Sequence, residues 1–519
     1  MKKQPASAGR LDWRAIDGLG ITRLVYDSRT VGPGDTFIAC PGTARDGRDY
    51  IAQAIANGAS SVLWERAGFS WGPRWKAPNV AVTGLRRRAG EIASRVCGRP
   101  SGRLWMVGVT GTNGKTTCSQ WIAQALNSAG RRCAVIGTLG YGMRPPLKPM
   151  VNTTPDAVWL HAQLAEFARH GAQAVSMEVS SIGLDQHRVS GVEFDVALFT
   201  NLSREHLEYH RTMRRYQEAK ARLFAWESLR HAVVNLDDDF GIELARRIRR
   251  PGLELVGYGF GGTRGTRTAF VAGSDMTADA RGVSFRVRTP WGSARVSSRA
   301  LGRFNASNLL GTLAVLLASG VALRRAVAAL SGLKPIPGRM QRLGGGSKPL
   351  VVVDYAHTPD ALEQVLLALR GLLSGSEFKV QASRLPARRR VAANSEPGTR
   401  NPELICVFGC GGERDRGKRP LMGRIAARLA DRVIVTSDNP RGEDPDAIIV
   451  HILDGVRNVN RELLVEPDRR GAIRHAIATA RRGDIVLVAG KGHEDYQEVR
   501  GVRRPFSDAA VAREALGQP

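Results

Sequence analysis

Short apolar runs alternate with segments of helical spacing in the first part of the chain. The apolar Leu24 to Tyr26 precedes a turn-rich stretch, Asp27 to Arg29. Thr36 to Ala39 and Ser61 to Trp64 are apolar runs of strand length, and Ile51 to Ala59 between them has helical spacing. This alternation is typical of a small α/β unit.

A second α/β region begins after the Gly-Arg-Pro-Ser-Gly stretch at 98–102. Leu104 to Val109 is a predicted strand, and Thr116 to Ala129 is a predicted helix. Strand–helix alternation continues through Phe199 and resumes at Val233 to Asn235. Ala269 to Ser298 then has the period-2 pattern of a sheet.

A third α/β region follows the Pro335 to Gly338 stretch. Its apolar runs have the continuous hydrophobic character of buried parallel strands, at Leu350–Val353, Leu404–Phe408, Arg432–Val435 and Ile485–Ala489. We therefore predict an α/β protein with three domains, at residues 1–99, 100–337 and 338–519. The segment 374–402 is rich in Ser, Pro, Gly and Arg with little apolar content, and we expect it to be an exposed insertion.

Length and composition agree with this division. A chain of 519 residues is too long for one hydrophobic core. Met1 to Arg10 is polar with no apolar stretch behind it, and no segment approaches the ~18 consecutive apolar residues of a membrane span. We expect a cytoplasmic protein without membrane insertion.

The net charge of +28 raises the question of a nucleic-acid partner. The excess is mostly arginine spread along the chain, and the densest cluster, Arg384 to Arg390, has neither helical nor strand periodicity. A basic surface also suits substrates that carry phosphates and carboxylates. We expect no nucleic acid as a partner. A nucleic-acid-dependent ATPase remains an alternative, and turnover stimulated by nucleic acid would reveal it.

The cysteines do not point to a metal site or to disulfides. Cys406 and Cys410 could form half of a zinc site, but no second Cys or His pair at zinc spacing accompanies them. Both lie beside an apolar run, which favours buried thiols.

A glycine-rich loop between the predicted strand and helix carries the clearest chemistry. Glycines allow several backbone N–H groups to point at one anion, and the helix N-terminus adds its dipole. Lys115 would neutralise phosphate charge, and the Thr116 hydroxyl can hold Mg²⁺. The predicted ATP-binding loop consists of Gly111, Thr112, Asn113, Gly114, Lys115, Thr116 and Thr117.

The wording of this loop resembles that of the Mur ligases, and the resemblance extends over nearly the whole chain. It implies a central P-loop ATPase domain, flanked by a small N-terminal α/β domain that binds the UDP substrate and a C-terminal Rossmann-like domain that binds an amino acid. The activity it implies is ATP-dependent formation of an amide bond. The folylpolyglutamate synthetases share the architecture and are the nearest alternative.

Three blocks of the central region look like Mur ligase motifs: Met177 to Ser181, Phe199 to His210, and Tyr216 to Lys220. By that resemblance Glu178 and His206 are ligands of a second Mg²⁺, and Lys220 carries a CO₂-derived carbamate; Thr116 is the metal ligand expected in the phosphate loop. A carbamate converts a cationic amine into an anionic oxygen donor, which hard Mg²⁺ prefers. The catalytic residues implied are Lys115, Glu178, His206 and Lys220.

The resemblance also implies substrate contacts outside the phosphate loop. Hydroxyls and amides can bond sugar and peptide groups, and an arginine can pair with a carboxylate or phosphate. The UDP-substrate contacts implied are Ser28, Asn152, Thr153, Thr154, Ser180, Gln186 and Arg188. The further ATP contacts implied are Asn305, Arg339 and His357.

Four positions differ from the residues that are usual in the family's motifs. Ile182 stands where a His is usual, and Glu205 and Glu208 replace Asp. Gln341 replaces the Glu that follows Gly-Arg-Met. The Asp-to-Glu changes keep the charge and lengthen the reach, whereas Ile182 removes a polar group near the expected metal site.

The stretch Asp438-Asn439-Pro440-Arg441 resembles the diaminopimelate signature of the Mur ligases that add the third peptide residue. Diaminopimelate differs from lysine by a carboxylate beside the distal amine, and a guanidinium can bind that carboxylate bidentately. In a lysine enzyme the guanidinium would face an amine. Arg414, Gly490 and Glu494 match further diaminopimelate contacts, with Glu494 on the distal ammonium.

The resemblance therefore implies two substrate partners besides ATP and Mg²⁺: UDP-N-acetylmuramoyl-L-alanyl-D-glutamate and meso-2,6-diaminopimelate. We expect a monomer. A folylpolyglutamate synthetase is disfavoured by three features: the three-domain content, the stretch Asp27 to Arg29 and the stretch Asp438 to Arg441. A lysine-adding ligase is the second alternative.

Overall fold

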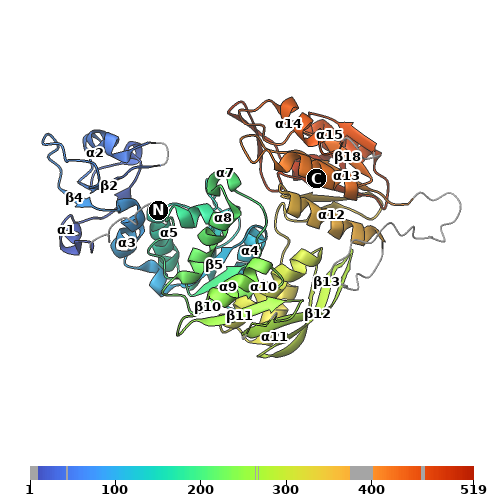
Figure 1. Cartoon of the computed structure of the whole chain (residues 1–519), viewed down its shortest axis with the longest axis horizontal. Helices are drawn as coiled ribbons and strands as arrows, with labels where there is room; N and C mark the ends of the chain where they lie inside the picture. Colours follow the sequence, from blue (N-terminus) through green and yellow to red (C-terminus); the bar gives the residue numbers. More distant parts are fainter. Residues whose placement is uncertain are drawn as a thin grey trace.

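The computed structural model describes residues 10–42, 45–263, 265–266, 268–374, 401–456 and 462–518. It has three lobes, each built on its own sheet, which follow one another along the chain from blue to red in Figure 1. The predicted insertion at 374–402 lies outside the described residues, apart from its two ends. The α/β fold class predicted from the sequence is confirmed.

The N-terminal lobe holds a parallel sheet in the order β1-β2-β3-β4. Its strands are β1 (Leu24–Val25), β2 (Thr36–Ala39), β3 (Ser61–Glu65) and β4 (Asn79–Val82). Its helices are α1 (Trp13–Asp17), α2 (Ile51–Ala56) and α3 (Leu85–Val96), with short 3₁₀ turns η1 (Ser28–Thr30) and η2 (Gly47–Tyr50). Asp27 caps η1 by accepting a hydrogen bond from Arg29 N, so the predicted turn forms at this point.

The central lobe holds a sheet in the order β14-β13-β12-β11-β10-β9-β5-β8-β6-β7. The strands from β12 to β6 in that order run parallel, and the two ends of the sheet are antiparallel. The strands are β5 (Trp105–Thr110), β6 (Cys133–Gly137), β7 (Gly140–Gly142), β8 (Ala174–Glu178), β9 (Val196–Phe199), β10 (His231–Asn235), β11 (Glu254–Gly259), β12 (Ala269–Asp279), β13 (Gly282–Thr289) and β14 (Gly292–Ser298).

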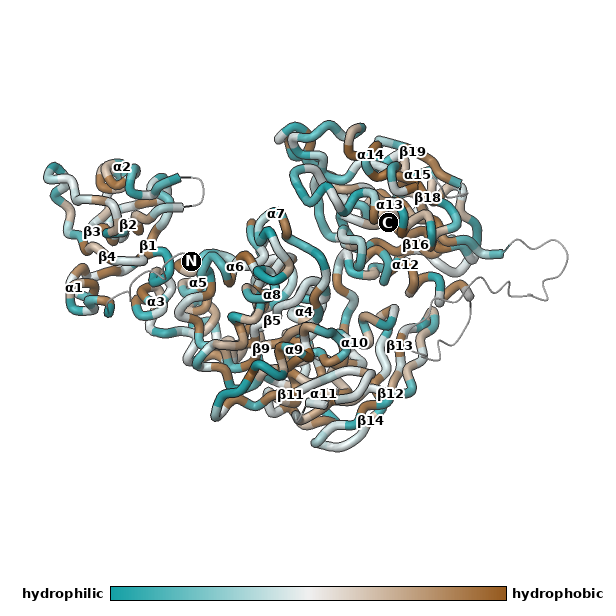
Figure 2. The backbone as a smooth tube through the Cα atoms, in the orientation of Figure 1, coloured by the Kyte–Doolittle hydropathy of each residue, from teal (hydrophilic) through white to brown (hydrophobic). Residues whose placement is uncertain are grey.

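Helices cover both faces of the central sheet, because its parallel strands carry apolar side chains on both sides. One core lies under α4, α10 and α11, and the other lies under α5, η4 and α9. Figure 2 shows these strands as largely hydrophobic. The helical segments are η3 (Pro100–Arg103), α4 (Lys115–Ser128), α5 (Ala157–Arg169), α6 (Ser181–Asp185), α7 (Leu207–His210), α8 (Met213–Ala221), η4 (Arg222–Ala225), α9 (Asp239–Arg247), α10 (Arg303–Ala318) and α11 (Leu323–Ser331).

The C-terminal lobe holds a sheet in the order β15-β16-β20-β17-β18-β19, parallel except for β15. Its strands are β15 (Gln341–Gly344), β16 (Leu350–Asp354), β17 (Leu404–Phe408), β18 (Arg432–Val435), β19 (Glu462–Val465) and β20 (Ile485–Ala489), with a separate hairpin of β21 (Tyr496–Val499) and β22 (Val502–Pro505). Its helices are α12 (Pro359–Ser374), α13 (Lys418–Leu429), α14 (Pro445–Leu453), α15 (Arg469–Thr479) and α16 (Asp508–Ala515).

Two sets of strand ends determine where a site can form. In the central sheet β9, β5 and β8 are neighbours, and in the C-terminal sheet β20, β17 and β18 are neighbours. All are parallel, so their carboxyl ends meet at one edge of each sheet, where ligands bind in open α/β folds. Among the described residues, no helix is long and apolar enough to span a membrane.

Candidate active site

The phosphate loop lies at the carboxyl end of β5 and leads directly into α4. Gly111 and Gly114 have φ of +147° and +85°. A Cβ at Gly111 would lie 1.9 Å from Thr200 Oγ1, and one at Gly114 would lie 2.5 Å from Asn308 Oδ1. Both positions therefore require glycine, on grounds of conformation and of space.

The neighbouring strand β9 holds this loop in place. Asn201, just beyond β9, accepts hydrogen bonds from Thr112 N at its backbone oxygen (2.8 Å) and from Asn113 N at its side chain (2.9 Å). Thr200 Oγ1 donates to Asn113 O at 2.6 Å. Lys115 Nζ donates to Gly111 O and Thr112 O, at 3.0 and 2.9 Å. Sequence reasoning did not identify Asn201 as part of the site.

Glu178 is the last residue of β8. It is fully buried and faces the start of α4. Thr116 Oγ1 donates to its carboxylate at 3.0 Å. Thr138 donates through its backbone N at 2.7 Å and through its hydroxyl at 3.1 Å. A buried carboxylate is thereby held against the first turn of the phosphate-loop helix.

Lys220 is a buried lysine on α8, with 1% of its surface exposed. Its Nζ donates to Gly111 O at 2.6 Å and lies 4.4 Å from the centre of the Tyr216 ring. Burial, together with the charge of Lys115, holds the pKa of Lys220 well below its usual value. Among the described residues it forms no ion pair with a carboxylate, and its amine is directed at the backbone of the phosphate loop.

His206 and Glu205 stand between α8 and the C-terminal lobe. His206 has a φ of +55°, which is unusual for a residue other than glycine and often marks a functional position. Glu205 Oε2 lies 3.7 Å from His206 Nε2, and Glu205 Oε1 lies 3.2 Å from His357 Nε2. Burial raises the pKa of Glu205, but the charges of His206, His357 and Lys115 more than offset this and hold it well below its usual range.

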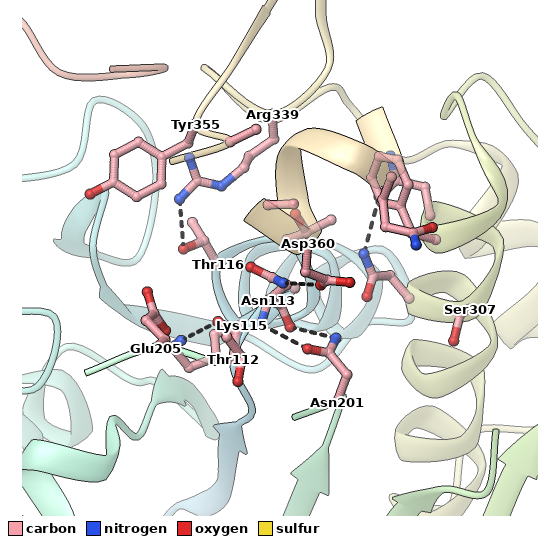
Figure 3. A pocket seen from close by; sticks show the side chains of 18 of the residues that line it. Thr112, Asn113, Lys115, Thr116, Asn201, Glu205, Ser307, Arg339, Tyr355 and Asp360 are labelled. Atoms are coloured by element: carbon pink, nitrogen blue, oxygen red, sulfur yellow. Dashed lines mark hydrogen bonds between the residues drawn. The ribbon is translucent and has the colours of Figure 1, made fainter. Parts of the chain in front are cut away.

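These groups line one cavity of about 570 Å³ between the central and C-terminal lobes. The predicted metal set (Thr116, Glu178, His206 and Lys220) lies in its wall, as do the phosphate-loop residues from Thr112 to Thr117 with Asn305, Arg339 and His357. Two contacts cross the cavity in Figure 3: Arg339 Nη2 donates to Thr116 Oγ1 at 3.2 Å, and Asn113 Nδ2 donates to Asp360 Oδ2 at 2.9 Å. Sequence reasoning missed Asp360, because a single acidic residue in a helix gives no sign that it belongs to a site.

A second cavity, of about 620 Å³, opens between the N-terminal lobe and the central lobe. Ser28, Asn152, Gln186 and Arg188 line it, together with the basic side chains Arg29, Arg45 and Arg86. Arg188 donates to Gln186 Oε1 through Nε (3.0 Å) and Nη2 (2.7 Å), so these two predicted contacts act as one unit.

The remaining predicted UDP-substrate contacts lie elsewhere. Thr153 and Ser180 line the first cavity. Thr154 is 1% exposed and bridges the end of β8 to α6, because its hydroxyl donates to Glu178 O and accepts from Ser180 N. Its side chain therefore braces the Glu178 turn. This internal role is invisible in the sequence, where Thr153 and Thr154 are equivalent.

The predicted diaminopimelate contacts come together on three segments, which we call the amino-acid loops: 409–414, 437–441 and 490–494. They follow β17, β18 and β20, whose carboxyl ends are adjacent. Asn439 Nδ2 donates to Glu494 Oε2 at 2.8 Å. A Cβ at Gly490 would lie 2.5 Å from Asp438 Oδ2, so glycine allows the second and third loops to approach each other.

Both predicted arginines of these loops contact backbone oxygens. Arg441 has a φ of +54° and donates through Nη1 to Gly412 O at 2.7 Å. Its backbone N donates to Glu498 O at 3.0 Å. Arg414 is exposed and donates to Glu413 O at 3.2 Å. The guanidinium of Arg441, which is expected to bind the substrate carboxylate, thus joins the first and second amino-acid loops.

Two further observations concern metals and thiols. Among the described residues, no three His, Cys, Asp or Glu side chains form a group that could hold a metal ion. Cys406 and Cys410 are free buried thiols, as the sequence favoured. Burial raises the pKa of Cys410 to about 11, so this thiol is not activated.

Comparison with known proteins assigns the family. Three family profiles match: "Mur ligase family, catalytic domain" over 20–96, "Mur ligase middle domain" over 109–316, and "Mur ligase, glutamate ligase domain" over 387–492. Relatives named UDP-N-acetylmuramoyl-L-alanyl-D-glutamate–2,6-diaminopimelate ligase, from Nitrosomonas europaea and Chromobacterium violaceum, are each 50% identical over 96% of this chain and over 93% and 95% of their own lengths.

Solved structures agree. One with the same ligase name is 38% identical, with a TM-score of 0.66, and the match covers 96% of this chain and 95% of that one. The MurF ligase of Thermotoga maritima in complex with ADP shares the fold at 19% identity and a TM-score of 0.60, covering 91% and 94% of the two chains. The resemblance stated from the motifs is therefore confirmed, and this chain belongs to the Mur ligase family.

Proposed function

We propose that this protein is an ATP-dependent ligase that joins meso-diaminopimelate to UDP-N-acetylmuramoyl-L-alanyl-D-glutamate in peptidoglycan synthesis. The observation that carries the choice of amino acid is the Asp438 to Arg441 segment, which lies beside Glu494 at one edge of the C-terminal sheet. A guanidinium and a carboxylate on adjacent loops suit the distal carboxylate and ammonium of diaminopimelate. Relatives that share half of the sequence carry this activity in their names.

In this proposal the first cavity binds ATP. The backbone N–H groups of the phosphate loop would surround the β- and γ-phosphates. Lys115 would turn from the loop carbonyls to the phosphates and offset their charge, and Arg339 enters from the opposite lobe to do the same. The basic second cavity would bind the UDP substrate through Ser28, Asn152, Gln186 and Arg188.

The residues present fit a Mg²⁺ ion at Thr116, Glu178, His206 and Lys220. All four line the first cavity, but only two of them are of the His, Asp or Glu type. A carbamate on Lys220 would supply the additional oxygen donor. It would form when the neutral amine attacks CO₂, making an N–C bond and releasing a proton. When bound, the metal would neutralise negative charge on the phosphoryl group in transfer.

The reaction would proceed in two steps. The free carboxylate of D-glutamate attacks the γ-phosphorus of ATP, which breaks the bond to ADP and forms an acyl phosphate. The amine of diaminopimelate then attacks the acyl carbon, an N–C bond forms, the C–O bond to phosphate breaks, and a proton is lost. The two cavities and the amino-acid loops lie on different lobes, so closure around the substrates would exclude water from the acyl phosphate.

An amino-acid-dependent assay of ADP release tests the proposal. The purified chain is supplied with ATP, Mg²⁺ and the muramoyl dipeptide, and then with either meso-diaminopimelate or L-lysine. We expect ADP release and the tripeptide product with diaminopimelate only. Equal or faster turnover with lysine would overturn the assignment of the amino acid, and no turnover with either would overturn the assignment of the reaction.

A further inference from the structure

We infer that Lys491 is a positioning residue that sets the geometry of Asn439 and Glu494 for the amino-acid substrate. Lys491 lies in the third amino-acid loop and has none of its surface exposed. Its ammonium cannot contact solvent, so it serves the groups around it. The inference rests on the proposed function, because it concerns how the same site recognises its amino acid.

Both hydrogen bonds of the Lys491 ammonium go to side chains predicted to meet diaminopimelate, and the ammonium also lies 5.4 Å from the centre of the Tyr496 ring. Its Nζ donates to Asn439 Oδ1 and to Glu494 Oε2, each at 3.0 Å. The Asn439 amide closes the triangle by donating to Glu494 Oε2 at 2.8 Å. Its Oδ1 also accepts from Glu498 N at 2.9 Å. The amide orientation of Asn439 is thus determined by donors on one side and an acceptor on the other.

This arrangement leaves Glu494 with one committed and one available oxygen. Oε2 accepts two hydrogen bonds from buried donors, whereas Oε1 has no hydrogen bond among the described residues. The side chain of Glu494 is 17% exposed, so it reaches the surface of the loops at this point. A carboxylate fixed by one oxygen presents the other in a single direction, which is the requirement for binding a substrate ammonium with selectivity.

The charges on the loops require a buried cation at this place. Asp438 is buried next to Asn439, and Glu494 adds a second carboxylate. Burial would raise the pKa of Asp438, but Arg469 and Lys491 more than offset it and keep its pKa below the usual value. Without Lys491 the two acids would repel each other, and Glu494 would turn toward solvent.

The central test is a double-mutant cycle of Lys491→Met, Glu494→Gln and the double variant. Methionine keeps the length of the side chain and removes its charge. We expect Lys491→Met to raise the KM for diaminopimelate about tenfold or more, with the KM values for ATP and the UDP substrate within about twofold. The effect of the double variant should be clearly smaller than the two single effects combined, because Lys491 acts in part through Glu494.

A purely structural role predicts a different result. Partial unfolding lowers the concentration of active enzyme and therefore kcat, but it leaves every KM unchanged. An unchanged KM for diaminopimelate, a parallel rise in all three KM values, or additive effects in the double variant would each overturn the inference. Lys348→Met, in the same lobe but outside the amino-acid loops, is the matched control, and it should leave all three KM values unchanged.

Two further comparisons keep the test decisive. If Lys491→Met does not fold, Lys491→Gln, which retains a donor without the charge, takes its place in the cycle with the same expected result. The wild-type protein is assayed first with diaminopimelate and with lysine. If it uses lysine, the proposed amino acid is wrong, but the cycle is run with lysine and still decides the role of Lys491, because both substrates carry a distal ammonium.

Discussion

The phosphate loop and the amino-acid loops achieve recognition in different ways. The phosphate loop consists of consecutive residues, 111–117, and presents backbone N–H groups whose direction follows from two glycines and a helix start. The amino-acid loops come from three distant segments and present side chains, whose direction depends on buried partners. Backbone recognition is therefore a local property of the sequence, whereas side-chain recognition is a property of the assembled fold.

Buried cations support the amino-acid loops from below. Arg469 has none of its surface exposed, pairs with the equally buried Asp508 at 2.8 Å, and donates to Ser437 O and Ala489 O. Arg419, also fully buried, binds both oxygens of Glu443 at 3.0 and 3.1 Å. Arg469 thus holds the backbone at the second and third loops, and Arg419 holds Glu443, which accepts a hydrogen bond from Glu413 N in the first loop. The phosphate loop needs no comparable charge network, because β9 holds it through Thr200 and Asn201.

The largest expected effect on activity comes from a substitution beside the phosphate loop. Lys220→Ala should reduce turnover by about 10³-fold or more, because it removes both the expected carbamate and the only basic side chain that α8 directs at Gly111. The measurement is kcat with saturating substrates. Short carboxylic acids should partly restore it, and labelled CO₂ should be trapped on the wild-type protein only. Full activity of the variant would refute the carbamate.

The next effect concerns the support under the amino-acid loops. Arg469→Met should cost about 3–5 kcal/mol of stability, because it leaves the Asp508 carboxylate buried without a partner. The measurement is chemical denaturation followed by fluorescence. Arg469→Met with Asp508→Leu should recover much of the loss, since both charges are then absent. If the single variant is as stable as the wild type, the pair is not the support that the geometry indicates.

The fold was predictable from the sequence to the extent that burial controls it. The runs Thr36 to Ala39, Leu404 to Phe408, Arg432 to Val435 and Ile485 to Ala489 are strands with the predicted ends, because both faces of their sheets are covered. β19 was missed. It is an edge strand whose residues are all exposed, so no burial pattern marks it.

The site was predictable where a motif is contiguous. Residues 111–117 and Asp438 to Arg441 were identified from their order in the chain, and the structure brings the latter to the same sheet edge as Glu494. Asp360, Lys491 and Asn201 were not identified. Asn201 lies inside the motif block Phe199 to His210, and Lys491 lies between the predicted contacts Gly490 and Glu494, but neither motif shows which of its residues holds a partner distant in sequence. Asp360 holds Asn113 and lies in no motif.

A smaller, selective effect is expected at Arg441. Arg441→Ala should raise the KM for diaminopimelate about 10- to 150-fold, the range of a charged hydrogen-bonded contact. The KM values for ATP and the UDP substrate should change little, and lysine should not become a good substrate, because removing a cation does not create packing for lysine. If the KM for diaminopimelate stays within about twofold of the wild-type value, Arg441 does not select the amino acid, and the selectivity must then come from Arg414 and Glu494.

Asp360 lies where the two modes of recognition meet, because it reaches from α12 to Asn113 in the phosphate loop. Burial raises its pKa above the usual value, and Glu363 adds to this, while hydrogen bonds from Ser203 and Asn113 oppose it. Between the unfolded and folded pKa values the folded state binds more protons, so stability falls as pH rises through that window. Above it, the folded protein carries a carboxylate at a cost that an amide would not incur.

Asp360→Asn should therefore raise Tm slightly at pH 7, on the order of 1 °C, because the amide keeps an acceptor for Asn113 without the buried charge. The advantage should shrink as the pH is lowered and vanish below about 3.9, where the acid is protonated in both states. Thermal melts of both proteins from pH 7 to pH 3.5 measure it. A Tm that is lower for Asp360→Asn at pH 7, with the deficit disappearing below about pH 3.9, would show that the ionised carboxylate stabilises the contact as an acceptor. The junction of the two lobes would then rely on charge, as the amino-acid loops do, and not on neutral hydrogen bonds like those that hold the phosphate loop.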